Sequence, residues 1–235
     1  MSQKKKKVVI LTGAGISAES GLGTFRDKGG LWDEYDINEV ATPEAWQKNP
    51  KLVLEFYDTR RDLCCKAKPN DAHLALAQLE SHYDVQIITQ NIDDLHERAG
   101  SKKILHLHGE ILKARSIANP ENLFLIGNKK IKWGDVAPDG HQLRPHVVWF
   151  GESVPKMYEA EDIVRESEIF IVIGTSLNVY PAANLIYASP PKTEKYIVDL
   201  NELSNIKYKN LIHFHGNATI KVPQLVNKLI QESKN

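Results

Sequence analysis

Short runs of apolar, mostly β-branched residues alternate along this chain with segments of helical periodicity. The runs predict strands at residues 8–11, 83–89, 104–108, 169–173 and 196–200. Because they are nearly continuous, such runs are typical of parallel strands that are covered on both faces. Apolar residues at helical spacing occur between or after them, in segments 71–79, 157–166 and 222–230. The alternation predicts an α/β fold, a Rossmann-like parallel sheet with helices on both faces.

Two segments interrupt this alternation. Residues 41–66 have a helical pattern with no strand between, and residues 116–143 are polar and punctuated by Gly, Pro and Asn. We expect both to be insertions that form a smaller lobe beside the sheet. The large part is then predicted at about 1–40, 68–112 and 146–235, and the small lobe at about 41–67 and 113–145. Apolar residues expected to pack the small lobe are Leu123, Phe124, Ile126, Ile131 and Trp133.

Composition narrows the class of protein. The 235 residues are 42% hydrophobic and 26% charged, which is ordinary for a globular chain. Thirty basic residues balance thirty acidic ones, so we expect no partnership with nucleic acid or with an anionic membrane. The chain lacks a run of 18 apolar residues that could span a bilayer. The two cysteines, Cys64 and Cys65, are adjacent and poorly placed for a disulfide, which favours the reducing cytoplasm.

A glycine-rich turn follows the first predicted strand. Residues 13–18 read Gly-Ala-Gly-Ile-Ser-Ala, a G-x-G-x-x-A form of the dinucleotide-binding pattern. Glycines let the backbone approach a pyrophosphate, whose charge free N–H groups and a helix dipole would hold. The second predicted strand ends in Thr89-Gln90-Asn91, without a carboxylate for the adenosine ribose. We therefore expect a nucleotide to lie differently here than in a dehydrogenase.

The next segment, residues 20–32, packs four glycines around Phe25, Arg26 and Trp32. A loop of this kind closes over a cofactor, or it is a surface loop pinned by its two aromatic residues. Farther along, Asn91 and Asp93 stand where a strand ends, the edge at which open α/β sheets bind ligands. Their amide and carboxylate suit ribose hydroxyls or a carboxamide, and the alternative is a helix cap.

Histidines and an arginine complete the candidate chemistry. His106 and His108 alternate along a predicted strand and should share a face. Either suits a general base, because the imidazole pKa lies near neutrality. Tyr57 and Arg60 are three apart on a predicted helix, so they share a face and suit a carboxylate ligand. The alternative for this pair is a solvated helix surface.

Six sequence blocks resemble the sirtuin family of NAD-dependent protein-lysine deacylases. They are GAGISAESGLGTFRDKGGLW, TQNIDDLHERAG, LHLHGE, RPHVVWFGE, GTSLNVYPAA and HGNA, which occur in that order between Gly13 and Ala218. The resemblance covers nearly the whole chain and implies one catalytic domain over residues 1–235. Its fold would be a large Rossmann-like NAD-binding part with a small inserted lobe.

The resemblance also implies roles for individual residues. NAD would contact Gly13, Ala14, Gly15, Ser17, Thr24, Phe25, Arg26, Trp32, Gln90, Asn91, Ile92, Asp93, Gly174, Thr175, Ser176, Asn201 and Ala218. His108, Asn91 and Asp93 would be catalytic, with His106 a packed or hydrogen-bonded neighbour. The substrate would contact Tyr57, Arg60, Val147, Val148, Trp149 and Phe150, the last four as a tunnel for the lysine stem beside a strand that pairs with the peptide.

The implied reaction removes acyl groups from lysines of proteins or peptides. The acyl oxygen attacks the anomeric carbon of the nicotinamide ribose, and nicotinamide leaves. His108 takes a proton from a ribose hydroxyl, which attacks the bound amide carbon, and water completes the reaction to give free lysine and O-acyl-ADP-ribose. Tyr57 and Arg60 match the Tyr-x-x-Arg pair of the members that remove succinyl and malonyl groups. The alternatives are protein mono-ADP-ribosyl transfer or NAD hydrolysis at the same site, or a non-catalytic NAD-binding module.

The chain departs from the family in one respect. Most members carry four zinc-binding cysteines between the catalytic histidine and the Arg-Pro-x-Val-Val strand, and this segment has none. His141 and His146 with Asp135 or Asp139 are spaced unlike any structural zinc motif. We therefore predict that no zinc is bound and that packing holds the small lobe.

Overall fold

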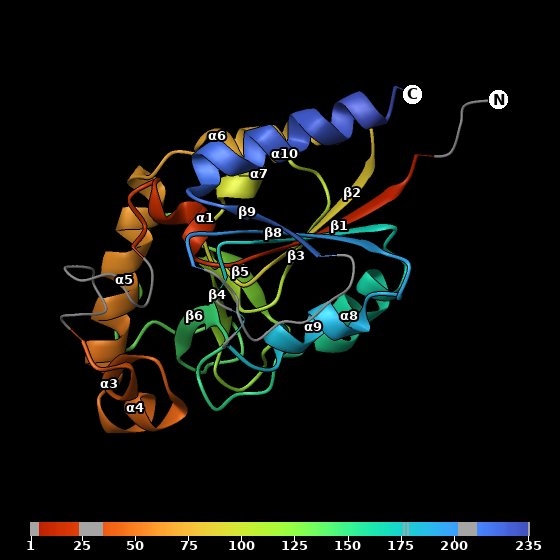
Figure 1. Cartoon of the computed structure of the whole chain (residues 1–235). Coiled ribbons are helices and arrows are strands. Elements are labelled where there is room, and N and C mark those ends of the chain that lie inside the picture. Colours follow the sequence, from red (N-terminus) through yellow and green to blue (C-terminus); the bar gives the residue numbers. More distant parts are fainter. Residues whose placement is uncertain (1–4, 24–34, 176, 178, 202–210, 235) are drawn as a thin grey trace.

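The computed structural model describes residues 5–23, 35–175, 177, 179–201 and 211–234. Strands and helices alternate as the sequence pattern predicts, and they build a six-stranded and a three-stranded sheet (Figure 1). Within the described residues, the helices are too short or too polar to cross a membrane.

The larger sheet is parallel throughout, with the strand order β3-β2-β1-β7-β8-β9. Its strands are β1 (Lys7–Thr12), β2 (Asp84–Thr89), β3 (Ile104–His106), β7 (Ile169–Ile173), β8 (Glu194–Asp199) and β9 (Leu211–His215). This is the strand order of a doubly wound dinucleotide-binding fold, in which the direction of strand addition reverses between β1 and β7. The predicted parallel α/β fold is confirmed.

Helices cover both faces of this sheet because alternate residues of β1 point to opposite sides. Val8 and Ile10 pack under α6 (Asp71–Leu79) and α10 (Ala218–Glu232), while Val9 and Leu11 pack under α8 (Met157–Arg165), η1 (Ala182–Asn184) and α9 (Leu185–Ala188). Figure 1 shows the first pair of helices above the sheet and α8 with α9 below it. Two short helices, α1 (Gly15–Ala18) and α7 (Leu95–Ala99), follow β1 and β2 at the carboxyl edge.

The smaller sheet is antiparallel, in the order β5-β4-β6. Its strands are β4 (Gly109–Ser116), β5 (Leu123–Leu125) and β6 (Leu143–Val147). The helices α3 (Ile37–Val40), α4 (Pro43–Lys48) and α5 (Pro50–Lys66) lie beside it. The helical segment 41–66 is therefore two helices, since the Asn49 side chain accepts a hydrogen bond from Leu52 N and caps a new helix that starts at Pro50.

The apolar residues expected to pack the smaller sheet do so only in part. Ile131 is buried, but Leu123 and Trp133 are 42% and 53% exposed, so the prediction is wrong for these two. The reason is that β5 is a three-residue edge strand with one covered face: Leu123 and Leu125 share the exposed face, while Phe124 points the other way. Phe124 and Ile126 are half-buried.

A buried ion pair also joins the smaller sheet to α5. Arg61 of α5 is fully buried and forms a salt bridge with Asp58 one turn earlier. Its Nε donates to the Ile111 carbonyl of β4 at 2.9 Å, and its Nη1 donates to the Lys129 carbonyl at 3.2 Å. Asp58 also accepts from Ile131 N at 3.2 Å. One arginine thus ties α5 to β4 and to the segment that leads into Ile131.

Candidate active site

A cavity of about 490 Å³ opens at the carboxyl ends of the parallel strands, where the strand order reverses. Its volume lies within the usual range for small-molecule sites. The predicted residues that line it are Gly13, Ala14, Gly15, Ser17, Tyr57, Arg60, Gln90, Asn91, Ile92, Asp93, His108, Val147, Val148, Trp149, Phe150, Gly174, Thr175, Asn201 and Ala218. Thr24, Phe25, Arg26, Trp32 and Ser176 lie outside the described residues.

The glycine-rich turn is used in a way that the motif alone did not indicate. Gly13 N donates to the Ile173 carbonyl at 3.0 Å, and Gly15 N donates to the Gly174 carbonyl at 2.9 Å. A Cβ on either glycine would lie 2.7 Å from an atom of Gly174 or Thr175. The glycines therefore let the turns after β1 and β7 touch. The expectation that these N–H groups are free for a pyrophosphate is wrong for these two.

His108 has its acceptor nitrogen available to the cavity. β3 ends at His106, so His108 lies in the turn before β4. Its Nδ1 bonds the Gln90 carbonyl at 3.0 Å; since a carbonyl only accepts, Nδ1 carries the proton and Nε2 of the neutral ring is a lone-pair acceptor. Burial lowers the pKa of His108 more than the Gln90 bond raises it. The ring is thus neutral near pH 7 and able to take a proton.

Ser17 joins the two polar residues of the loop after β2. Asn91 Nδ2 donates to Ser17 Oγ at 3.1 Å, and Ser17 Oγ donates to Asp93 Oδ2 at 3.1 Å. Asn91 also donates to the Gly13 carbonyl at 3.1 Å. Burial raises the pKa of Asp93, partly offset by hydrogen bonds from Leu95 N and Ser17. Asp93 Oδ1 accepts from Leu95 N, the first residue of α7, at 3.1 Å, but the N-cap of this helix is Asp94, so the capping alternative is wrong.

His106 does not share the cavity face with His108, contrary to the expectation from strand alternation. The described cavity lining includes His108 and omits His106. The alternation fails because β3 stops at His106 and the chain turns before His108. His106 Nδ1 lies 3.2 Å from the Asn91 carbonyl and its Nε2 lies 2.8 Å from Glu97 Oε1, the hydrogen-bonded position expected for it.

Tyr57 and Arg60 both face the cavity from α5, so this helix face is not the solvated surface of the alternative interpretation. Tyr57 is only 4% exposed. Burial raises the pKa of its phenol, and the nearby Arg60 charge opposes that shift. The neutral phenol of Tyr57 and the guanidinium of Arg60 therefore both line the cavity, where they can donate hydrogen bonds to a ligand.

The turn after β6 forms a neighbouring part of the wall, since Trp149 and Tyr57 belong to one hydrophobic cluster. Since β6 ends at Val147, the residues Val148 to Phe150 belong to a turn rather than to the strand. Arg144 holds this turn: its guanidinium forms bonds of 2.7 and 3.2 Å to Glu152, donates to the Val147 carbonyl at 2.9 Å and lies 3.2 Å from the Trp149 ring centre. Apolar side chains are thereby presented to the cavity on a rigid support.

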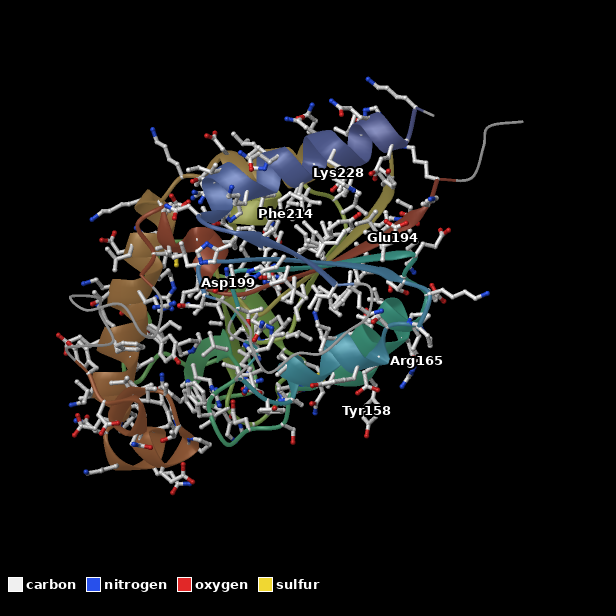
Figure 2. All side chains as sticks on the ribbon, in the orientation of Figure 1. Tyr158, Arg165, Glu194, Asp199, Phe214 and Lys228 are labelled. Atoms are coloured by element: carbon white, nitrogen blue, oxygen red, sulfur yellow. The ribbon has the colours of Figure 1, made fainter. Side chains whose placement is uncertain are left out.

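The sequence analysis did not predict several residues that line the cavity, including Glu19 and Asp199. Figure 2 labels Asp199 at the carboxyl edge of the sheet, with Glu194 at the other end of β8. The rule that ligands bind at strand ends would have found Asp199. Glu19 had no local signal: its carboxylate accepts from Asn217 Nδ2 at 2.9 Å and Thr219 Oγ1 at 2.8 Å, across the fold.

Among the described residues, no group of three or more His, Cys, Asp or Glu side chains is placed to hold a metal ion. Cys64 is buried at the cavity wall and Cys65 is partly exposed, and both are free thiols.

The strand order, the glycine-rich turn and the cavity at the strand reversal define an α/β protein of the dinucleotide-binding class. More narrowly, the chain belongs to the Sir2 family, whose model matches residues 13–181. A Helicobacter pylori protein named NAD-dependent protein deacylase is 51% identical over 226 residues, with 96% of each chain covered. A Bacteroides thetaiotaomicron protein of the same name is 48% identical over 230 residues, covering 96% of this chain and 98% of the relative.

The fold agrees with solved members of the family. A crystal structure of a Sir2 homologue–NAD complex has a TM-score of 0.88 and 37% identity to this chain, and the match covers 97% of this chain and 91% of that one. The predicted membership of the sirtuin family is therefore confirmed.

Proposed function

We propose that this chain is an NAD-dependent protein deacylase that removes acyl groups from lysine side chains and favours succinyl and malonyl groups. The products would be free lysine, nicotinamide and O-acyl-ADP-ribose. The observation that carries the proposal is one continuous cavity that holds the glycine-rich turn, His108 and the Tyr57–Arg60 pair. Family membership and the names of the relatives support the same chemistry. We further expect the protein to act in the cytoplasm.

The cavity residues fit NAD by their position and chemistry. The turns after β1 and β7 would hold its phosphates, Asn201 and Ala218 its adenosine, and residues 90–93 its nicotinamide riboside. When bound, NAD supplies a glycosidic carbon that becomes reactive as nicotinamide departs. Ser17 orients both Asn91 and Asp93 toward this end, because one hydroxyl bonds both side chains.

Proton transfer falls to His108. Its Nδ1 is held by the Gln90 carbonyl, so Nε2 is the atom that takes a proton from a ribose hydroxyl. The neutral ring at pH 7 is the form that can accept it. The walls at Val147 and Trp149, both buried, exclude water that would otherwise compete with the acyl group.

Selection of the acyl group falls to Tyr57 and Arg60. The guanidinium can bind a carboxylate through two N–H groups, and the phenol adds a third donor. Charge-assisted hydrogen bonds contribute about 1.5–3 kcal/mol each. Two of them would favour a succinyl over an acetyl group by about a hundred-fold or more. An acetyl group would still fit the pocket but has no carboxylate for these donors to bind.

The test uses matched lysine peptides carrying acetyl or succinyl groups, incubated with and without NAD and analysed by mass spectrometry. We expect NAD-dependent loss of succinyl well above acetyl. An Arg60→Met variant should lose succinyl turnover and keep acetyl turnover, and Tyr57→Phe should behave the same way more weakly. Removal of the acetyl group but not of the succinyl group would refute the proposal that Tyr57 and Arg60 select acidic acyl groups. NAD consumption without deacylation would refute deacylase activity and favour ADP-ribosyl transfer or NAD hydrolysis.

A further inference from the structure

His106 lies beneath the loop that carries Asn91 and Asp93, outside the described cavity lining. It is the last residue of β3, 6% exposed, and its ring makes one hydrogen bond from each nitrogen. Nδ1 lies 3.2 Å from the Asn91 carbonyl oxygen, and Nε2 lies 2.8 Å from Glu97 Oε1 of α7. Neither partner is used by the reaction steps described above.

The identity of these two partners determines the protonation of the ring. A backbone carbonyl only accepts hydrogen bonds, and so does an ionised carboxylate. A neutral imidazole has a single N–H, so it can satisfy one of the two partners and turns a lone pair toward the other. Both bonds form together only when both ring nitrogens carry protons. The geometry therefore favours an imidazolium at His106.

The charges around His106 favour the same state. Four carboxylates among the described residues face it: Glu97, Asp93, Asp94 and Glu110, the last paired with Lys113 at 2.8 Å. The buried ring of His96 is a further titratable neighbour among the described residues. Burial lowers the pKa of His106, but the hydrogen bond and charge of Glu97, the charge of Glu110 and the hydrogen bond to the Asn91 carbonyl together outweigh it, so the net pKa is raised.

His106 and His108 act on successive carbonyls of one loop. His108 binds the Gln90 carbonyl and is neutral, while His106 binds the Asn91 carbonyl and is charged. Two residues apart in sequence, they hold the loop after β2 at two adjacent points. A shift of that loop would move Asn91 and Asp93 away from the position set by Ser17.

We propose that His106 is a positioning residue that works as a buried cation. Paired with Glu97, it donates a hydrogen bond to the Asn91 carbonyl and so fixes the loop that presents Asn91 and Asp93 to the cavity. Its effect on turnover rests on the proposed function, whereas its charge does not. Two consequences follow. The chemical step should depend on His106 more than NAD binding does, and deprotonation of His106 should set a fall in kcat at high pH.

The charge is tested first, by NMR titration of the histidine ring nitrogens in the unliganded protein. We expect His106 to be doubly protonated at pH 7 and to lose its proton about one to two pH units lower in Glu97→Gln, where the charge-assisted bond is weakened. Glu110→Gln is the matched control: it removes a facing carboxylate that has no hydrogen bond to the ring, so the shift should be smaller. A His106 that is neutral at pH 6.5 and unchanged in Glu97→Gln would overturn the proposal.

The positioning role is tested by kcat and KM for NAD against pH. The high-pH fall in kcat of Glu97→Gln should move down by the shift that NMR measures, and its kcat should approach the wild-type value only at a pH low enough to keep the ring charged in both. The KM for NAD should change less than about twofold. An unchanged kcat profile despite a shifted NMR titration would overturn the role in turnover. A wild type without deacylase activity would refute the proposed function, and the NMR result would still decide the charge.

Discussion

The buried pair Asp58–Arg61 offers a quantitative test of what holds the smaller sheet on α5. Arg61 is 0% exposed and Asp58 is 11% exposed, and the Asp58 carboxylate also accepts Ile131 N. Replacing Asp58 by Asn retains an acceptor for Ile131 N but leaves the Arg61 charge buried without a counterion. Breaking a buried ion pair from one side costs about 3–5 kcal/mol. For a chain of this size each kcal/mol lowers Tm by about 2–4 °C, so we expect a fall of about 10 °C.

The assay is urea unfolding followed by circular dichroism, with a thermal scan beside it. Asp62→Asn is the matched control on the same helix: its ion pair with Lys66 spans 2.6 Å but is exposed, so the midpoint should stay at the wild-type value. The double variant Asp58→Asn/Arg61→Met should regain part of the loss, because the unpaired charge is gone. Asp58→Asn at wild-type stability would refute the reasoning, and so would an equal loss in Asp62→Asn.

Three further predictions concern the site and the core. His108→Ala should lower deacylation by at least about 10²–10⁴-fold while NAD affinity, measured by calorimetry, stays within a few-fold; near-normal turnover would contradict the role of His108. Gly109→Ala should destabilise the fold and reduce turnover together, because Gly109 has φ +84° and a Cβ would clash with the His146 carbonyl; an unaffected variant would show that the turn can relax. Burial lowers the pKa of His73 to about 4. As the pH is lowered, His73 is therefore protonated in the unfolded state before it is protonated in the folded state. The His73 contribution to the free energy of unfolding is fully present above pH 6.5, and it should fall by about 3 kcal/mol between pH 6.5 and pH 4. His73→Gln should flatten that part of a urea-unfolding pH series, and an unchanged slope would exclude His73 as its cause.

The parallel core and most of its boundaries could be predicted because they depend on local pattern. The run 169–173 became β7 without change, and the segment 71–79 became α6, which the Asn70 side chain caps. β9 was missed because its residues alternate weakly and lie at the edge of the sheet, where little apolar burial marks them. The strand predicted at 104–108 was two residues too long, and this shortening separates His106 from His108.

Contacts between segments far apart in the sequence could not be predicted from the hydrophobic pattern or from short motifs. Ser17 bonds Asn91 and Asp93 across 74 and 76 residues, and Arg61 bonds Ile111 across 50. A buried arginine also contradicts the ordinary expectation for its residue type, which is solvent exposure. The exposed Leu123 was misjudged for the complementary reason: hydrophobicity predicts burial only where another layer covers that face of the strand.

The sequence by itself determined the parallel sheet, its two helix layers, the family and the identity of most cavity residues, since these follow from hydrophobic period and short motifs. Only the tertiary structure decided which groups share a proton or a charge. Whether His106 is a cation and His108 a neutral base depends on the acceptors that each ring meets, two for His106 and one for His108. These acceptors come from the loop after β2 and from α7 rather than from the neighbouring residues. Protonation follows the local field and hydrogen bonds, which exist only once the chain has folded.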